Sequence, residues 1–235
     1  MKIALIGHGA MGRLVESQAR ATGDQIGAIL TSRDSASSVI DDIAASLKGH
    51  DVAIDFSAGN AVVRSVEACV RAGVPLVEGT TGWKPDEAEV RRIVTELGGA
   101  LVYGANFSIG VNVFYKLTAE AAKLMAQLDQ YEAFVEEQHH SRKRDVPSGT
   151  ALNLKELITE HIKVDIPIAS TRAGDIPGTH RVGFDSAADQ ITLTHTARSR
   201  AGFAGGALMA ARWIIGRKGV YEFSDVIDEM LNKDE

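Results

Sequence analysis

The chain opens with an apolar run that leads straight into a glycine-rich turn, and this junction restricts the possible folds more than any other feature. Residues 2–6 are typical of a buried strand and a helical pattern follows the turn, so the spacing Gly-x-Gly-x-x-Gly stands between them. In such a turn the first glycine permits a tight bend, the second lets the backbone approach a pyrophosphate, and the third lets the helix pack closely on the strand. Glycines that only formed a turn would explain one position and not the spacing. The sequence therefore predicts a dinucleotide-binding turn made of Gly7, His8, Gly9, Ala10, Met11 and Gly12.

Apolar, strand-like segments alternate with helical patterns as far as residue 103. Strands are predicted at residues 25–30, 51–56, 74–77 and 100–103, with helices near 36–48, 60–72 and 85–97. Repeated β-α-β units indicate an α/β fold with a Rossmann-type, doubly wound parallel sheet. Ligands of such sheets bind at the carboxyl ends of the strands. Besides the segment 55–57, the expected cofactor-binding residues at these ends are Gly79, Thr80, Thr81, Gly104, Ala105, Asn106 and Phe107.

Two of these segments have a more specific interpretation. The loop 79–82 is expected to place small residues and N–H donors near the nicotinamide, although an ordinary glycine-rich loop explains it equally well. Phe107 is expected to supply an apolar wall. The second strand ends in Thr31-Ser32-Arg33, where an NAD-preferring site usually offers an acid to the ribose. Ser32 and Arg33 are predicted to accommodate the extra phosphate of NADP, unless Arg33 is a solvated loop residue. The sequence favours NADPH, with NADH as an accepted alternative.

A second polar cluster, residues 137–151, crowds proton donors and anion-binding groups between a predicted strand at 131–137 and a predicted helix from Thr150. Loops between regular elements commonly hold catalytic residues. The imidazoles of His139 and His140 titrate near neutrality, and Lys143 follows closely. The competing interpretation of the basic residues at 142–144 is a solvated loop or a nucleic-acid patch.

The predicted helix after this cluster begins with Ser148-Gly149-Thr150. A helix start favours an anion, because its free N–H groups and the positive end of its dipole face the ligand. Gly149 lets the backbone approach a ligand closely, and the hydroxyl groups of Ser148 and Thr150 add donors or cap the helix. The cluster therefore suits a reaction on an anionic substrate.

Composition narrows the class of ligand. The net charge of -6 argues against binding to nucleic acid or to an anionic membrane, so the local basic cluster favours a small anion. The single cysteine, Cys69, cannot form an internal disulfide and is expected to be a buried apolar side chain in the helix at 61–72. No apolar run approaches the roughly 20 residues that span a bilayer, and the N-terminus enters a strand without a cleavable signal pattern. We expect a soluble, cytoplasmic protein, and no metal site is predicted.

Taken together, the motifs resemble the family of 4-hydroxy-tetrahydrodipicolinate reductase, also called dihydrodipicolinate reductase. The likeness extends over nearly the whole chain. The departures are a shorter glycine-rich turn and the missing acid after the second strand, and both concern cofactor preference. The matching motifs are Glu137-x-His139-His140-x-x-Lys143-x-Asp145-x-Pro147-Ser148-Gly149-Thr150-Ala151, Gly79-Thr80-Thr81-Gly82, Asn106-Phe107-Ser108-Ile109-Gly110-Val111-Asn112, Arg172-x-Gly174-x-x-Pro177-Gly178-x-His180 and Arg200-x-x-Phe203-Ala204-x-Gly206-Ala207.

This resemblance implies an oxidoreductase of diaminopimelate and lysine biosynthesis. Its substrate is a cyclic imine with two carboxylates, which loses its hydroxyl as water and takes hydride from NADPH or NADH. By resemblance His139 is a proton donor and acceptor, Lys143 is a second proton donor, and His140 contacts the substrate. Ser148, Gly149 and Thr150 hold a substrate carboxylate. Cations near the imidazoles should lower their pKa values and the bound dicarboxylate should raise them, so protonation is expected to follow substrate binding.

Beyond residue 107 the pattern changes to a helix at 111–128 and then mostly to strands, which predicts a second, α+β domain with a mixed sheet. The segments 206–215 and 223–231 are expected to return to the first domain, as in the family. The dinucleotide-binding domain would then comprise residues 1–107 and 208–235, and residues 108–207 would form a substrate-binding and oligomerisation domain. Hinges near residues 106–107 and 207–208 would let the halves close and exclude water.

Two further expectations concern the second domain. Residues 191–197 alternate and put His195 on the face of Ile191 and Leu193, which favours a packed sheet histidine over a catalytic one. Open sheet edges make association of sheets plausible. The resemblance implies a homotetramer, and the edges alone are also compatible with a dimer.

Two other functions remain open at this level. An amino-acid or aldehyde dehydrogenase would explain the glycine-rich turn but not the histidine, lysine and Ser-Gly-Thr cluster. A non-catalytic NAD(P)H sensor would bind nucleotide without consuming it. Turnover of the cyclic imine distinguishes both from a reductase.

Overall fold

The computed structural model describes residues 1–31 and 39–232. The chain divides into two compact units, and the first is discontinuous. Unit 1 comprises Met1–Ile109 with Arg200–Glu235, and unit 2 comprises Gly110–Ser199. The sequence analysis placed the second boundary and a hinge at Ala207-Leu208, but both residues lie inside helix α8 (Ala201–Ile214). The whole helix belongs to unit 1, because its small residues pack against that unit's backbone: a Cβ on Gly206 would stand 1.8 Å from the carbonyl oxygen of Phe107.

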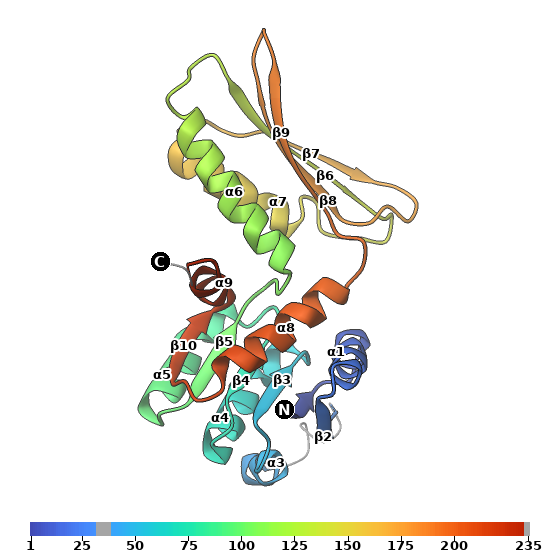
Figure 1. Ribbon diagram of the computed structural model, residues 1–235, viewed down its shortest axis with the longest axis vertical. Coiled ribbons are helices and arrows are strands. Elements are labelled where there is room, and N and C mark those ends of the chain that lie inside the picture. Colours follow the sequence, from blue (N-terminus) through green and yellow to red (C-terminus); the bar gives the residue numbers. More distant parts are fainter. Residues whose placement is uncertain (32–38, 233–235) are drawn as a thin grey trace. The chain divides into compact units, whose positions relative to one another are not determined.

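Unit 1 contains a six-stranded, wholly parallel sheet with the strand order β10-β5-β4-β3-β1-β2, which confirms the predicted doubly wound fold (Figure 1). Its strands are β1 (Lys2–Ile6), β2 (Gln25–Leu30), β3 (Val52–Asp55), β4 (Leu76–Glu78), β5 (Ala100–Tyr103) and β10 (Gly219–Glu222). Its helices are α1 (Ala10–Ala21), α3 (Ile40–Leu47), α4 (Val62–Ala72), α5 (Glu87–Glu96), α8 and α9 (Phe223–Leu231), with short 3-10 turns at Gly59–Ala61 and Lys84–Asp86.

Burial explains why these segments form a layered sheet. The central strands β1 and β3 are almost wholly apolar and buried, as expected of a parallel sheet covered on both faces. Helices α3, α4 and α5 pack on one face, and α1 and α8 lie together on the other. Cys69 belongs to the α4 layer and is 1% exposed, which confirms its predicted role as a buried apolar side chain. No helix in the described part of the chain combines the length and the apolarity needed to cross a membrane.

The strand order also locates the natural ligand crevice of unit 1. The chain passes from β1 to β2 on one side and then returns to β3 on the other side of β1. Crevices in sheets of this kind open beyond the carboxyl ends of the strands at such a reversal. The glycine-rich turn directly follows β1, and Phe56 directly follows β3, so both lie at this point.

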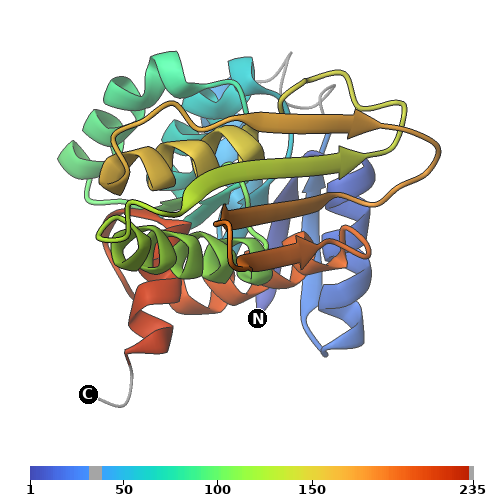
Figure 2. The ribbon, with the colours of Figure 1, turned by 90° about the horizontal axis from the view of Figure 1, so that it is seen from above.

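Unit 2 contains a four-stranded mixed sheet, as predicted, with the order β7-β6-β8-β9 (Figure 2). Strands β6 and β7 are parallel, whereas β8 is antiparallel to both β6 and β9. Residues of helices α6 and α7 share one apolar core with one face of the sheet. The elements are α6 (Ile109–Met125), β6 (Glu132–His139), α7 (Gly149–His161), β7 (Ile168–Arg172), β8 (Thr179–Asp185) and β9 (Gln190–Thr196).

Strand β6 differs from its expected extent in a way that matters for function. The sequence analysis ended this strand at Glu137 and assigned His139 to a loop, but the strand continues through His139. Alternate burial continues with it, so that Val135, Glu137 and His139 all face the helix-covered side. The polar residues ended the apolar alternation in the sequence, although they did not end the strand. His195 lies in β9 as predicted, and its ring stacks on that of Phe114 with centroids 6.0 Å apart.

Candidate active site

Three adjoining cavities in unit 1, all bordered by Phe56, follow the carboxyl ends of its strands. The largest has a volume of about 640 Å³ and includes Gly7, His8 and Gly9 in its wall, together with Thr31 and Arg64. The next, of about 340 Å³, is lined by Ala10, Met11, Gly79, Thr80 and Thr81 among others. Most of the expected cofactor-binding residues therefore line one continuous group of cavities.

The glycines of the first turn have different structural duties. Gly7 has a φ of +85°, and a Cβ there would stand 2.6 Å from the carbonyl oxygen of Phe56. A Cβ on Gly12 would stand 2.2 Å from the carbonyl oxygen of Gly7, so these two glycines are required by the packing of the turn itself. Gly9 has nothing within 4 Å of its Cβ position. Its open space adjoins the free N–H groups at the start of α1, which is where a pyrophosphate can be bound.

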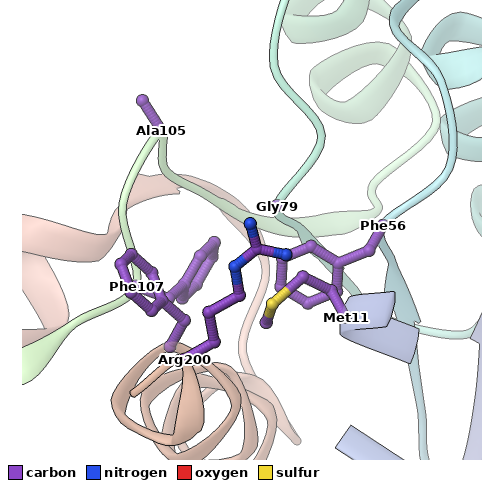
Figure 3. Close-up of a pocket in the computed structure, with 7 residues that line it drawn as sticks. Met11, Phe56, Gly79, Ala105, Phe107 and Arg200 are labelled. Atoms are coloured by element: carbon purple, nitrogen blue, oxygen red, sulfur yellow. The ribbon is translucent and has the colours of Figure 1, made fainter. Parts of the chain in front are cut away.

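The third cavity, of about 220 Å³, is mainly apolar and contains one guanidinium group. Met11, Phe56, Phe107 and Phe203 form much of its wall. Figure 3 shows Arg200 extending from the start of α8 toward Gly79 and Phe56. An arginine beside aromatic walls suits a planar ligand that carries an anionic group. The sequence analysis quoted Arg200 and Phe203 in a family motif but gave them no role.

Two buried carboxyl groups lie beneath the loops that border these cavities. Asp55 and Glu78 stand opposite each other on β3 and β4, and both are 0% exposed. The backbone N–H of Ser57 donates to Asp55 Oδ1 at 2.7 Å, and that of Thr80 donates to Glu78 Oε1 at 2.7 Å. Burial raises the pKa of both carboxyl groups, and the neighbouring charge of Asp55 raises the pKa of Glu78 further, well above its usual range. Each carboxyl group thus fixes the backbone of one cofactor-side loop.

Three expected cofactor residues in the described part of the chain, Gly12, Gly104 and Asn106, do not line these cavities, and Gly12 packs on Gly7 instead. Gly104 packs on Phe223, whose Cβ lies 3.1 Å from where a Cβ on Gly104 would stand. Asn106 accepts a hydrogen bond from the backbone N–H of Ser108 at 2.9 Å and shapes the turn before α6. Ser32 and Arg33 lie outside the described residues.

Unit 2 contains a buried polar cluster centred on Glu137, whose side chain has no exposed surface. Its Oε1 accepts three hydrogen bonds, from Ser170 Oγ at 2.7 Å, Arg172 Nη2 at 2.8 Å and the backbone N–H of Ser148 at 3.0 Å. Burial by itself raises the pKa of Glu137, but these donors outweigh it and bring that pKa to about 2. Glu137 is therefore ionised at neutral pH. Strand register explains why these side chains lie close together, since Ser170 on β7 and His180 on β8 are the direct cross-strand neighbours of Glu137.

His139 lies beside the second oxygen of this carboxylate. Its Nδ1 is 3.2 Å from Glu137 Oε2, and its ring meets that of His180 edge to face with centroids 5.0 Å apart. Burial lowers the pKa of His139, Glu137 raises it, and the cations of Lys143 and Arg172 lower it, with a net decrease. His139 is thus neutral at neutral pH in the free protein, and an added anion in contact with it would favour its protonation.

The loop after β6 carries the other expected catalytic and substrate-binding residues. Lys143 Nζ forms an ion pair with both carboxylate oxygens of Asp145 at 2.7 and 2.8 Å. Arg172 Nη2 also donates to the backbone oxygen of Asp145 at 2.6 Å, which ties the loop to β7. His140 is half-buried and begins the turn in which the backbone N–H of Lys143 donates to its carbonyl oxygen.

The start of α7 has the geometry of an anion site. Ser148 is the N-cap residue, and its Oγ accepts from the backbone N–H of Ala151 at 3.2 Å and pairs with His180 Nε2 at 3.0 Å. Gly149 has nothing within 4 Å of its Cβ position, so a ligand can approach the backbone there. Thr150 follows in the first turn and is half-buried. The structure brings Ser148 into contact with the cluster around Glu137 and His139.

Glu137, His139 and His180 present ligand-type atoms within 4.8 Å of one another, a spacing that also suits a metal ion. Two observations favour a network of hydrogen bonds instead. Glu137 Oε1 already accepts from three donors, one of them the Arg172 guanidinium, and His180 Nε2 is paired with Ser148 Oγ. No role was predicted for Glu137, Arg172 or His180 from the sequence, although all three stand in the motifs given above. The alternation of β6 could have placed Glu137 on the buried face of the strand. Its contacts with residues of β7 and β8 depend on the register between distant segments, which the local pattern does not reveal.

Comparison with known proteins gives a consistent result. Residues 1–107 match the family described as "Dihydrodipicolinate reductase, N-terminus", and residues 110–227 match "Dihydrodipicolinate reductase, C-terminus". The 4-hydroxy-tetrahydrodipicolinate reductase of Christiangramia forsetii is 37% identical over 98% of this chain and 99% of its own. That of Anaeromyxobacter dehalogenans is 39% identical over 80% of this chain and 77% of its own. The resemblance inferred from the motifs is confirmed.

Solved structures support the same fold. The dipicolinate-bound dihydrodipicolinate reductase of Paenisporosarcina sp. TG-14 superposes with a TM-score of 0.80 at 20% identity, over 96% of this chain and 99% of that one. An amine dehydrogenase of Mycobacterium smegmatis superposes with a TM-score of 0.62 at 13% identity, over 95% of each chain. The architecture therefore occurs with more than one chemistry, and function must be argued from the site.

Proposed function

The chain belongs to the dihydrodipicolinate reductase family, whose members are oxidoreductases of lysine and diaminopimelate biosynthesis, and we propose that it reduces 4-hydroxy-tetrahydrodipicolinate to tetrahydrodipicolinate with NAD(P)H and loss of water. The assignment of residues rests mainly on one observation: His139 and Ser148 both contact the side chain of Glu137. Glu137 Oε2 is 3.2 Å from His139 Nδ1, and Glu137 Oε1 accepts from the N–H of Ser148 at 3.0 Å. An acid–base group and a carboxylate-binding helix start therefore meet at one buried carboxylate.

His139 and Lys143 are the proposed proton donors. Reduction builds electron density on the imine ring, and a positioned proton or cation stabilises it. In the free protein the pKa of His139 is lowered, chiefly by burial. The negative charge of a bound dicarboxylate raises that pKa, so that substrate binding favours protonation of His139. Lys143 is free to exchange its partner Asp145 for an anionic substrate, because the pair is partly exposed.

The helix start of α7 is the proposed substrate-carboxylate site. Ser148, Gly149 and Thr150 provide backbone and hydroxyl donors there, and His140 is the neighbouring substrate contact. Two features support an anion at this position: the uncrowded backbone at Gly149 and the N-cap geometry of Ser148. The Paenisporosarcina relative was solved with dipicolinate, a planar ring with two carboxylates, which is consistent with a substrate of that class.

The cavities of unit 1 are the proposed cofactor site. When bound, the nicotinamide supplies the hydride. The open space at Gly9, the cavity at the reversal of strand order and the apolar wall of Phe107 all fit a dinucleotide. We favour NADPH over NADH, since positions 31–33 after β2 hold no acid and Arg64 adds a cation to the wall that Leu30 and Thr31 share. Ser32 and Arg33 remain proposed contacts of the extra phosphate.

A homotetramer is the proposed assembly. Helices cover one face of the unit 2 sheet, while Thr192, Thr194 and Thr196 on the outer face of β9 are exposed. An open sheet face and edge of this kind favour pairing with another copy. Light scattering coupled to size-exclusion chromatography separates a tetramer from a dimer.

The decisive assay follows absorbance at 340 nm with the freshly formed condensation product of pyruvate and aspartate semialdehyde. NADPH and NADH are compared for the wild type, His139→Ala and Lys143→Ala. Rapid turnover by the wild type, lost in both variants while nucleotide binding persists, is the expected result. The ratio of the two wild-type rates gives the cofactor preference. Lys123→Ala, an exposed lysine of α6 in a long ion pair with Glu120, is the matched control and should retain full activity.

Other outcomes discriminate among functions. A folded protein that binds nucleotide and oxidises neither form would contradict the reductase and favour a sensor. Oxidation with another carbonyl or imine, but not with this substrate, would favour a different dehydrogenase. Full activity in both variants would leave the reaction intact and overturn the assigned proton donors.

A further inference from the structure

We propose that Glu137 is a positioning residue that fixes His139, so that Nε2 is the atom which transfers the proton, while it anchors the helix start that binds a substrate carboxylate. This inference rests on the proposed function. To the proposed function it adds a positioning role for Glu137, the identity of Nε2 as the proton-transfer atom of His139, and a link between that imidazole and the start of α7. The two carboxylate oxygens have different neighbours. Oε1 faces Ser148, Ser170 and Arg172, and Oε2 faces His139.

Glu137 acts only as a hydrogen-bond acceptor. Three donors converge on Oε1 at 2.7 to 3.0 Å, including a guanidinium. Such an arrangement stabilises the ionised form of a buried carboxyl group, because the three donors compensate the charge of the carboxylate. An ionised carboxylate has no hydrogen to donate, so any hydrogen bond at Oε2 must come from the neighbouring side chain.

The contact with Glu137 sets the tautomer of His139. Within the described residues, neither Glu137 Oε2 nor His139 Nδ1 has another hydrogen-bond partner, and both atoms are buried. They stand 3.2 Å apart, whereas His180 Nε2 is 3.7 Å from the same oxygen and is already paired with Ser148 Oγ at 3.0 Å. Leaving both unpaired would carry the desolvation penalty of each buried polar group. Neutral His139 therefore carries its hydrogen on Nδ1, and its lone pair is on Nε2.

His139 Nε2 has room. A Cβ on Gly178 would stand 3.1 Å from His139 Nε2 and 3.3 Å from its Cδ2. Because this residue is glycine, position 178 places no side chain over the nitrogen that remains when Nδ1 faces Glu137. His139 can thus accept a proton at Nε2, become an imidazolium, and transfer that same proton to the reduced ring. It returns to the Nδ1–H tautomer while Nδ1 stays beside Glu137 Oε2.

The charges around His139 define what removing Glu137 does to its titration. Lys143 and Asp145 lie on the loop after β6, Arg172 lies on β7, and His180 lies on β8. Glu137 and Asp145 favour the imidazolium, whereas Lys143 and Arg172 oppose it. Loss of the Glu137 charge therefore lowers the pKa of His139. If activity depends on the imidazolium, the loss of activity with rising pH must then begin at a lower pH than in the wild type.

The test compares Glu137→Gln with Glu136→Gln. Both changes remove one carboxylate from β6, but Glu136 points to the opposite face and pairs with Arg181 at 3.1 Å. In Glu137→Gln the side-chain oxygen can still accept from Ser148, so the helix start is retained, while an NH₂ group replaces the acceptor at His139. We expect kcat to fall by about 100-fold, within the usual contribution of a general acid. The Michaelis constant of the imine should change little, and the alkaline limb of the kcat profile should move to lower pH.

A purely structural role gives a different pattern. It would raise the Michaelis constant or lower the melting temperature without moving the pH limb, and that result would overturn the proposal. Glu136→Gln should reproduce wild-type kcat, pH profile and oligomeric state. An equal loss in both variants would show a general effect of charge and would also count against Glu137.

A second measurement needs no turnover and no variant of Glu137. Imidazole ¹⁵N shifts in histidine-labelled wild-type protein report the tautomer of each ring, and His139→Gln identifies the signal of His139. The proposal requires the Nδ1–H form for neutral His139. A predominant Nε2–H form would overturn it, even if Glu137→Gln failed to fold. If the wild type proves inactive but the Nδ1–H form is found, the proposed reaction fails and the positioning contact stands. A divalent metal retained stoichiometrically by purified protein and released by chelator, with a change in this signal, would assign the cluster to metal binding instead.

Discussion

The carbonyl oxygen of Gly7 lies 2.2 Å from the point where a Cβ on Gly12 would stand, so the first and third glycines of the turn are packed backbone to backbone. Gly12→Ala must push this turn apart. We expect a loss of about 1–3 kcal/mol of stability, as for other overpacked sites, together with weaker NAD(P)H binding. Gly9 is the matched comparison, because nothing lies within 4 Å of its Cβ position. Gly9→Ala should weaken nucleotide binding while the melting temperature is unchanged. Thermal melting and fluorescence titration measure both effects, and an unchanged melting temperature in Gly12→Ala would contradict the packing argument.

The pair of Asp55 and Glu78 predicts an unusual dependence of stability on pH. Burial raises the pKa of Glu78, and the neighbouring Asp55 raises it further. The folded state then binds more protons than the unfolded one above pH about 4, so stability is lost as the pH rises from there. Glu78→Gln keeps the shape and an acceptor for the N–H of Thr80. It should raise the melting temperature near pH 8, because it removes the buried charge that Glu78 must carry there. The gain should shrink steadily toward about pH 5.

Glu89→Gln is the control for this prediction. Glu89 is exposed and paired with Arg92, whose hydrogen bond lowers the pKa of Glu89. Its substitution should give no gain near pH 8. If Glu78→Gln gave the same gain at every pH, the stabilisation would come from packing and not from the removed charge.

Parts of the molecule that depend on local pattern were predictable from the sequence. The strand, turn and helix at 2–21 follow from apolar spacing and from glycines whose contacts are within the same turn, apart from Phe56. Helix α9 was expected at its observed bounds, Phe223–Leu231. The end of β6 was missed by two positions, His139 being its last residue, because inward polar side chains interrupt the apolar alternation.

Features that depend on distant segments were not predictable. Glu137 meets His180 only because β6 and β8 pair in that register, and it meets Ser170 only through β7. The local sequence of β6 contains no information on its pairing with β7 or with β8. The boundary at Arg200 was also missed, since the small residues of α8 suit packing on either unit, and the contact of Gly206 with Phe107 decides between them.

Gly178 provides a direct test of access to His139 Nε2, the proposed proton-transfer atom. A methyl group at this position would stand 3.1 Å from His139 Nε2, closer than most carbon contacts allow. Gly178→Ala should therefore lower kcat strongly while nucleotide binding and the melting temperature change little. Gly205→Ala adds the same methyl group in α8 at 3.7 Å from Gln18 Oε1, an ordinary contact, and should leave kcat unchanged. Steady-state kinetics with both variants measure the difference. Wild-type kcat in Gly178→Ala would mean that His139 does not transfer its proton through Nε2.

Ser148 links the helix start to the imidazole cluster, and its hydroxyl group has two duties. It accepts from the N–H of Ala151 at 3.2 Å and pairs with His180 Nε2 at 3.0 Å. Ser148→Ala should cost about 1 kcal/mol of stability as a lost N-cap. It should also raise the Michaelis constant of the imine more than it lowers kcat, because the proposed carboxylate site is disturbed while His139 and Glu137 remain. Thr159→Ala removes a hydroxyl from the same helix, one that donates to the carbonyl oxygen of Lys155 at 2.8 Å, and should alter neither constant. Melting curves and initial rates over a range of substrate concentrations separate the two effects. A fall in kcat with an unchanged Michaelis constant would place Ser148 with the proton-transfer residues and remove the substrate carboxylate from the start of α7.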